Sequence, residues 1–262
     1  MGARVRRLSN LAPRDWRDAL LQIGLFVLAY NAYQVVRGVV ESKEALALAN
    51  AERIVDIERA TGTYFEPAFQ QLLIENARWL VDLSNFTYLN SHFVMTAGFL
   101  LWLYFRRNEH FYFVRNMFMV AMLCALVLYV LYPTAPPRLY GDGFVDTIDV
   151  YTGLPQDSGA ADVLVNRFAA VPSMHIAFAL MIAVPGVVLS RSSIAKAWWT
   201  AYPMIVLFAI VATGNHFWLD AAAGAAVACL AAVAAGRLAR ARPGRWSWEP
   251  SRVGLSAPIG QR

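Results

Sequence analysis

The chain has 262 residues, of which 58% are hydrophobic and only 16% are charged. This composition excludes an ordinary soluble domain and indicates an integral membrane protein. The formal charge of +5 arises from arginine-rich blocks that alternate with acidic blocks, as in membrane topologies, and no basic segment interleaved with aromatic residues points to nucleic acid. We therefore expect a single all-α, polytopic membrane domain over residues 1–262, with its core at about 19–238 and without a nucleic-acid partner.

Six apolar segments are long enough, or nearly so, to cross a bilayer as helices. They cover residues 19–36, 78–105, 115–132, 172–189, 197–211 and 217–238. The first follows Arg4, Arg6 and Arg7 as a signal peptide would, but polar residues stand where a small-residue cleavage site belongs. We therefore expect a retained anchor.

The distribution of Lys and Arg predicts the orientation of these spans in a cell membrane. Residues 1–18, 106–115, 190–196 and 237–262 hold 16 of the 23 basic residues, which places these segments and both termini in the cytoplasm. The tail 240–262 lacks periodicity and is expected to be disordered. On the extracytoplasmic side, residues 42–61 alternate charged and apolar residues at helical spacing, which predicts an amphipathic helix at the membrane interface.

Two candidate catalytic motifs lie at the extracytoplasmic ends of the fourth and sixth spans. Pro172-Ser173-Met174-His175 opens the fourth span, where proline suits the first helical position and the free amides of the first turn suit a phosphate. In the sixth span Asn215 is a candidate N-cap, and His216 and Asp220 are spaced so that the carboxylate can fix one imidazole nitrogen and leave the other free to attack. A lone histidine is more often structural, but two histidines and a membrane-embedded aspartate on one side favour a functional interpretation.

These motifs resemble those of the type 2 phosphatidic acid phosphatase (PAP2) superfamily, and within it the inositolphosphotransferase and sphingolipid-synthase-like branch. The resemblance extends from about residue 49 to residue 236. Pro172-Ser173-Met174-His175 is similar to the second motif of the family, His216-Phe217-Trp218-Leu219-Asp220 to the third, and Pro137-Arg138 to a degenerate first motif. The order, spacing and shared side of the motifs make the combination specific.

The chain departs from the phosphatase pattern at two cationic positions. Leu131 stands where the fuller first motif carries a lysine, and Ile210 stands where the fuller third motif carries an arginine. These departures favour the lipid phosphotransferase branch, and Arg167 is a candidate for part of the missing positive charge.

The resemblance implies a phosphohistidine mechanism that needs no metal and no cofactor. His216 would attack phosphorus, Asp220 would orient its ring, and His175 would protonate the leaving oxygen before activating the acceptor. The substrate-binding residues would be Arg138, Arg167, Ser173 and Asn215.

The expected function is therefore a membrane lipid-phosphate phosphotransferase or phosphatase with an extracytoplasmic site. It would act on a lipid phosphate or phospholipid among the membrane lipids and transfer the phospho-headgroup to a polyol such as inositol, with hydrolysis of a lipid or polyprenyl phosphate as the alternative. Two other classes stay open: a zinc enzyme that uses the histidines and the aspartate as ligands, and a transporter that uses them as a path. His92 on the second span is expected to form a helix-to-helix hydrogen bond, and His110 a cytoplasmic headgroup contact.

Overall fold

A computed structural model describes residues 16–153 and 166–241, and within these ranges the chain forms helices and no strand. The predicted all-α class is confirmed for this part of the chain. The arginines at positions 4, 6 and 7 and most of the tail expected to be disordered lie outside the described residues.

Four of the described helices are long and apolar enough to cross a membrane. They are α2 (Trp16–Glu41), α7 (Asn108–Leu131), α12 (Ser193–Ala212) and α13 (Trp218–Ala241). Each contains or closely matches one predicted span. The predicted fourth span is a helix of 16 residues, α11 (Met174–Leu189).

The predicted second span is built from three consecutive helical pieces. α5 (Arg78–Phe86) continues into a turn of π-helix, η1 (Thr87–Ser91), and then into α6 (His92–Arg106). A π-turn inserts an extra residue into the helical ladder and rotates the residues that follow. By helix length and composition, the structure therefore supports four of the six predicted spans.

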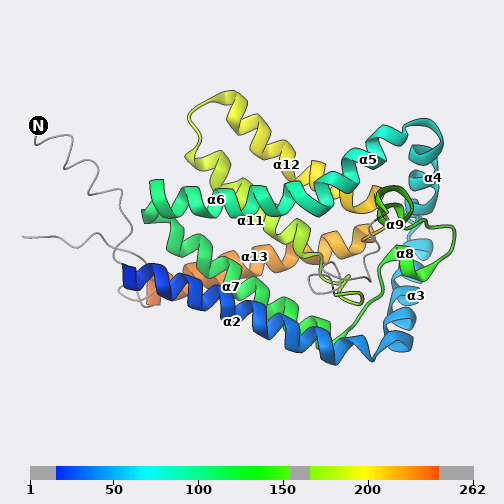
Figure 1. The fold of residues 1–262 in the computed structure, drawn as a ribbon, viewed down its shortest axis with the longest axis horizontal. Coiled ribbons are helices and arrows are strands. Elements are labelled where there is room, and N and C mark those ends of the chain that lie inside the picture. Colours follow the sequence, from blue (N-terminus) through cyan, green and yellow to red (C-terminus); the bar gives the residue numbers. More distant parts are fainter. Residues whose placement is uncertain (1–15, 154–165, 242–262) are drawn as a thin grey trace, which may run out of the picture.

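The extracytoplasmic segments of the prediction gather at one end of the structure. Figure 1 shows α3 (Glu44–Ala60), α4 (Glu66–Asn76), α8 (Pro137–Tyr140) and α9 (Thr147–Thr152) at the end where α11 and α13 begin. The links between α6 and α7 and between α11 and α12 lie at the other end. Segments that the basic residues assign to one side of the membrane thus share an end of the molecule.

The predicted amphipathic helix is present as α3, although it begins two residues later and ends one residue earlier than expected. Ala47, Ala51, Ile54 and Val55 recur at helical spacing and are buried against the rest of the protein. Gly62, with φ of 69°, follows the last turn and allows the chain to reverse. The helix therefore lies across the end of the bundle with one face inward.

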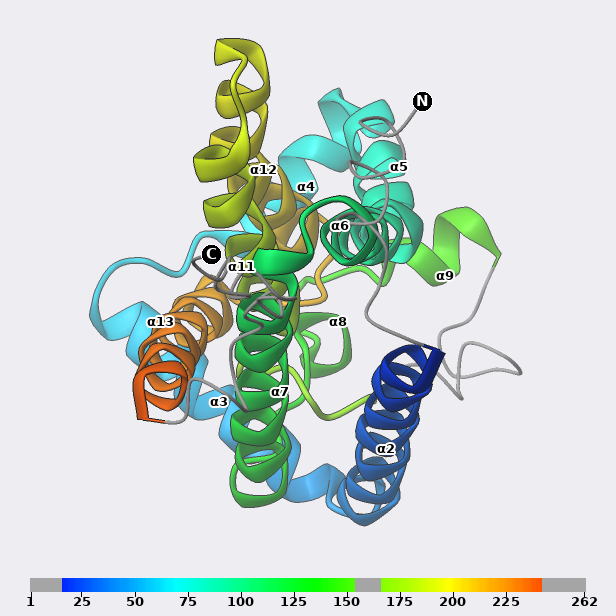
Figure 2. The same cartoon turned by 90° about the vertical axis from the view of Figure 1, so that its left-hand side faces the viewer.

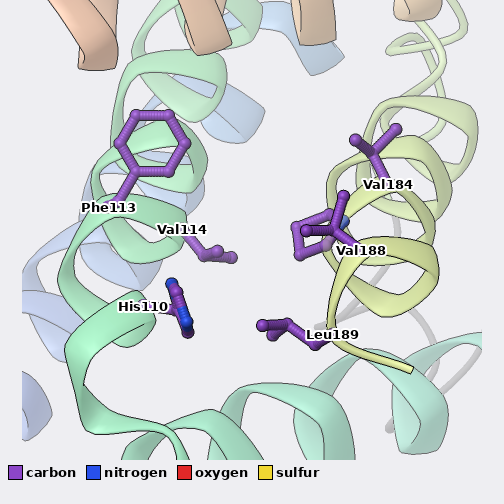
Figure 3. Close-up of a pocket in the computed structure, with 7 residues that line it drawn as sticks. His110, Phe113, Val114, Val184, Val188 and Leu189 are labelled. Atoms are coloured by element: carbon purple, nitrogen blue, oxygen red, sulfur yellow. The ribbon is translucent and has the colours of Figure 1, made fainter. Parts of the chain in front are cut away.

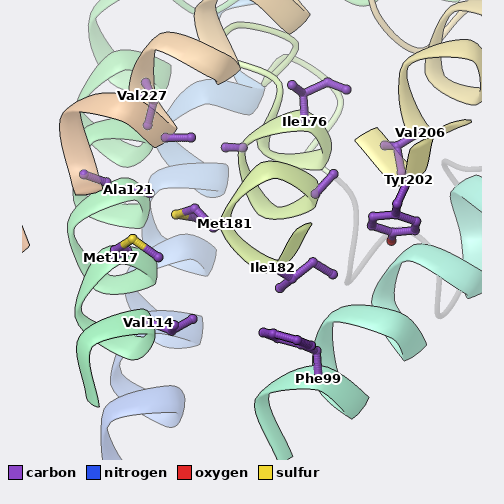
Figure 4. Close-up of a cluster of buried hydrophobic side chains, with 14 of the residues drawn as sticks. Phe99, Val114, Met117, Ala121, Ile176, Met181, Ile182, Tyr202, Val206 and Val227 are labelled. Atoms are coloured by element: carbon purple, nitrogen blue, oxygen red, sulfur yellow. The ribbon is translucent and has the colours of Figure 1, made fainter. Parts of the chain in front are cut away.

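The larger core cluster is formed where α6, α7, α11, α12 and α13 meet (Figure 4). In Figure 2, α7 and α11 lie near the middle of the bundle, and each contacts α6 and α13. α13 contributes mainly small side chains to this cluster, which lets its backbone approach its neighbours. Gly224 is the extreme case, because a Cβ there would overlap the carbonyl oxygen of Ser173 just before α11.

The two ends of the long connection between α7 and α11 are tied together. The amide of Thr134 donates to the carbonyl of Phe168 at 2.9 Å, and the amide of Ala170 donates to the carbonyl of Thr134 at 3.1 Å. This short parallel bridge brings Pro137-Arg138 close to the segment that leads into His175.

Candidate active site

His216 lies in a turn between α12 and α13 rather than on the face of a helix. α13 begins at Trp218, and Gly214 adopts a positive φ of 67° just before the turn. The amides of Asn215 and His216 donate back to the carbonyl of Ile210 at 3.1 and 3.2 Å and so close the end of α12. The prediction that Asn215 is the N-cap of the sixth span is therefore wrong. α13 begins three residues later, at Trp218, and the amides of Asn215 and His216 belong to the turn that ends α12.

Asp220 nevertheless reaches His216 from the first turn of α13. Its Oδ2 lies 3.3 Å from Nδ1 of His216 and also accepts a hydrogen bond from the amide of Phe217 at 2.9 Å. The Asp220 side chain is fully buried and that of His216 is 6% exposed, so bulk water competes little for this pair. The carboxylate can therefore hold Nδ1 protonated and leave Nε2 with its lone pair.

The fourth predicted span begins two residues later than expected, at Met174, with Ser173 as the residue before the helix. The amide of Ser173 donates to the carbonyl of Asp220 at 3.0 Å and is therefore not free to bind a phosphate. This backbone bond and the close approach of Gly224 join the start of α11 directly to α13. His175 follows in the first turn, and its Nδ1 lies 3.4 Å from Nε2 of His216.

The three predicted catalytic side chains thus form one line, from Asp220 through His216 to His175. In this line His216 presents one nitrogen to a carboxylate and the other to a second imidazole. Such a line can activate a nucleophilic nitrogen at one end and supply a proton-transfer group at the other.

Arg138 lies beside the turn that carries His216. Its Nε donates to Oδ1 of Asn215 at 3.1 Å, and its Nη1 forms an ion pair with Oδ2 of Asp146 at 2.9 Å. The amide of Arg138 also donates to the carbonyl of Gly214 at 2.8 Å. Asp146, which the sequence did not single out, therefore helps to hold the guanidinium next to the turn. Arg167 stands on the segment tied to Thr134.

The two residues that stand where the fuller family motifs carry a lysine and an arginine lie in different environments. Leu131 is 71% exposed at the end of α7, whereas Ile210 is fully buried and its carbonyl holds the His216 turn. Neither position offers a charge to the site, and the cation that the structure places beside the His216 turn is Arg138, on the connection between α7 and α11.

Two buried glutamates at the start of α13 were missed by sequence reasoning. Oε1 of Glu66 accepts from the amide of Trp218 at 3.1 Å, and Oε1 of Glu58 accepts from the amide of Leu219 at 3.4 Å. Both side chains are fully buried, and burial together with the neighbouring Glu66 carboxyl raises the pKa of Glu58 to about 9. Glu58 is therefore protonated near neutral pH. In the sequence, a charged residue on the apolar face of the predicted amphipathic helix is the signal that could have revealed Glu58.

Aromatic rings from the second predicted span surround His175. Tyr88 stacks on His175 with ring centroids 4.4 Å apart, and His92 lies 5.1 Å away. The expected helix-to-helix hydrogen bond of His92 is present, since its Nδ1 lies 3.1 Å from the hydroxyl of Tyr202.

Other groups lie away from this line. The pocket in Figure 3 lies between α7 and α11, lined by His110 and apolar side chains, at the end of α11 opposite to His175. Across residues 16–153 and 166–241, no group of three or more His, Cys, Asp or Glu side chains is arranged to hold a metal ion.

Comparison with known protein families gives a match. The family model of the PAP2 superfamily matches residues 52–234. This range contains α4 to α12, the turn with His216, and most of α13, which carries Asp220. No curated protein and no solved structure matches the chain. With this match over most of its length and its long apolar helices, the chain belongs to the PAP2 superfamily, whose members are generally phosphatases and phosphotransferases, and is a multi-pass membrane protein.

Proposed function

We propose that this protein is a lipid-phosphate phosphotransferase that forms a phosphohistidine on His216 and passes the phospho-headgroup to an alcohol such as inositol. Hydrolysis of a lipid or polyprenyl phosphate is the alternative outcome of the same chemistry. The observation that carries the proposal is the line Asp220–His216–His175, in which Nε2 of His216 faces Nδ1 of His175 at 3.4 Å.

The first half-reaction uses the lone pair on Nε2 of His216. This nitrogen attacks phosphorus, the bond between phosphorus and the leaving oxygen breaks, and His175 gives its proton to that oxygen. A bound phosphoryl group takes the place of the contact between the two rings. Asp220 stabilises the positive charge that develops on His216, because its buried carboxylate accepts a hydrogen bond from Nδ1–H.

The second half-reaction reverses these roles. The acceptor hydroxyl loses its proton to His175 while its oxygen attacks phosphorus, and the bond to Nε2 of His216 breaks. An alcohol gives a new phosphodiester or phosphomonoester, whereas water gives free phosphate from a lipid phosphate and a phosphorylated headgroup from a phospholipid. No step in this sequence requires a metal ion or a cofactor.

Positive groups and hydrogen-bond donors are available for the phosphoryl oxygens. Arg138 and Arg167 would supply charge, and Asn215 fixes Arg138 beside the nucleophile. The hydroxyl of Ser173 and the indole Nε1 of Trp218 are buried donors that have no hydrogen-bond partner within the described ranges. Buried donors of this kind suit the equatorial oxygens of a phosphate.

We further propose six spans, with the site on the extracytoplasmic side and both termini in the cytoplasm. The basic residues favour this orientation, and the segments that they assign to each side share an end of the molecule (Figure 1). A lipid substrate would then present its headgroup at the outer boundary of the bilayer.

The deciding experiment offers the purified protein labelled lipid phosphates and phospholipids, each with and without inositol. A labelled inositol phosphoester, formed together with the released lipid alcohol and only when inositol is present, supports transfer, and free phosphate in both cases supports hydrolysis. His216→Ala should abolish turnover, and with an aryl phosphate His175→Ala should accumulate a phosphohistidine, because a phenolate leaves without a proton. Full activity of His216→Ala would end the proposal. Vanadate, which mimics the five-coordinate phosphorus, should inhibit.

A further inference from the structure

His92 is a buried titratable group beside the catalytic line that the reaction does not yet use. It follows directly after the π-turn η1, which also carries Tyr88. Tyr88 stacks on His175, and the ring of His92 lies 5.1 Å from that of His175 at an interplanar angle of 44°. π-turns are frequent at functional sites, and this one brings two rings of the same span to one catalytic imidazole.

Two ring nitrogens in this cluster lack partners. Nε2 of His92 and Nε2 of His175 are both buried, and neither has a hydrogen-bond partner in the part of the chain that the structure describes. The other nitrogen of each ring is engaged: Nδ1 of His92 with the Tyr202 hydroxyl at 3.1 Å, and Nδ1 of His175 with His216 at 3.4 Å. An unmade hydrogen bond to a buried polar atom destabilises the folded protein, so two on adjacent rings call for an explanation.

The proposed reaction places a requirement on His175. Its Nδ1 must release a proton in the first half-reaction and take one up in the second, so its Nε2 must stay protonated throughout. A ring whose second nitrogen has no acceptor can instead place its proton on Nδ1 and lose its function as a base. His175 therefore needs a hydrogen-bond acceptor on the side away from His216.

We infer that His92 is a positioning residue whose Nε2 accepts a hydrogen bond from Nε2–H of His175, while its own Nδ1–H donates to the Tyr202 hydroxyl. The inference rests on the proposed function, because it assigns His175 its part in both half-reactions. The bond tightens when substrate separates His175 from His216, as catalytic hydrogen bonds commonly do on substrate binding.

The two catalytic imidazoles then have supports that differ in charge. His216 becomes cationic when it bonds to phosphorus, and the carboxylate of Asp220 stabilises that charge. His175 must surrender a proton, and a neutral imidazole orients it without adding a negative charge that would oppose the release. A carboxylate at position 92 would hold the proton on His175 more firmly.

Two amide variants separate this role from a purely structural one. In His92→Gln the amide oxygen can reach the position of Nε2 and accept a hydrogen bond, whereas in His92→Asn the amide lies at the position of Nδ1 and can satisfy only Tyr202. We expect His92→Asn to lower kcat on the order of 10–100-fold, with KM within about threefold, and His92→Gln to recover most of it. A structural role through Tyr202 predicts the opposite order.

A substrate with a different leaving group gives a second readout. p-Nitrophenyl phosphate releases a phenolate that needs no proton, so His92→Asn should keep the wild-type burst of phenolate and lose only the later transfer to the alcohol. Tyr202→Phe, which removes the partner of His92 without changing its Nε2, should show the same pattern more weakly. Thermal unfolding in detergent checks that each variant is folded.

The inference is overturned if His92→Asn keeps wild-type kcat, if asparagine rescues and glutamine does not, or if burst and transfer fall together in a folded variant. Failure of the proposed function looks different. In that case the wild-type protein forms no phosphohistidine, or His216→Ala stays active, whatever the His92 variants do.

Discussion

Gly224→Ala tests whether the contact between α11 and α13 sets the distance between His175 and His216, the two histidines proposed to be catalytic. Gly224 faces the backbone just before α11, and a Cβ at this position would overlap the carbonyl oxygen of Ser173 and stand 3.0 Å from its carbonyl carbon. Ordinary contacts of a Cβ begin at 3.4 Å. Because the atoms in the way are backbone, no side chain can turn aside to make room.

The size of the effect follows from this overlap. To restore normal contact the two backbones must part by on the order of 1 Å, and overpacking of this kind costs about 1–3 kcal/mol of stability. The same movement strains the bond from the Ser173 amide to the Asp220 carbonyl, which is 3.0 Å long. A misplacement of about 1 Å at a catalytic group lowers kcat on the order of 100-fold.

Gly236→Ala is the matched control, because Gly236 lies on the same helix and a Cβ there would meet nothing within 4 Å. It should keep full activity and gain up to about 1 kcal/mol from helix propensity. The assay is kcat with a lipid phosphate, together with thermal unfolding of both variants in detergent. Wild-type kcat in Gly224→Ala would refute the idea that this close approach fixes the site.

Three further outcomes are expected. The folded protein keeps the proton on Glu58 up to about pH 9, whereas the unfolded chain releases it near pH 4.5. The free energy of unfolding should therefore fall as pH rises between these values. Glu58→Gln should flatten that fall in thermal unfolding scans from pH 5 to 10. Arg138→Lys cannot bond to Asn215 and Asp146 at once, so it should lower kcat/KM on the order of 10–100-fold. Asp146→Asn should lower kcat/KM by a smaller factor. Wild-type kcat/KM in both variants would contradict this role of Arg138. Prolonged dialysis against EDTA should leave turnover unchanged, and a loss restored by zinc would favour a metal enzyme.

The sequence predicted the helical class and the places of the long helices, because runs of apolar residues are a local signal. It was less accurate at helix starts near the site. Asn215 and Pro172 both carry signals for the first turn of a helix, yet the helices begin at Trp218 and Met174. The Ser173 amide donates to the distant carbonyl of Asp220, and such a tertiary bond leaves no local pattern. The amides of Asn215 and His216 instead close the end of α12 by donating to the carbonyl of Ile210.

The residues missed around the site were missed for a related reason. Glu58 bonds to an amide 161 positions later in the chain, and Glu66 bonds to one 152 positions later. A charge on the inward face of an amphipathic helix hints at a partner without saying which one. The spacing of His216 and Asp220 pointed to their pairing, although the regular helix assumed in predicting it begins after His216.

The support of α13 by Glu58 and Glu66 has a consequence for biogenesis. Both carboxyls emerge from the ribosome about 150 residues before the amides that they bind. Spans are inserted in chain order, so the early segment stays without these partners until the last span has entered the bilayer. A nascent or truncated chain therefore lacks the contacts that hold the start of α13, next to His216 and Asp220.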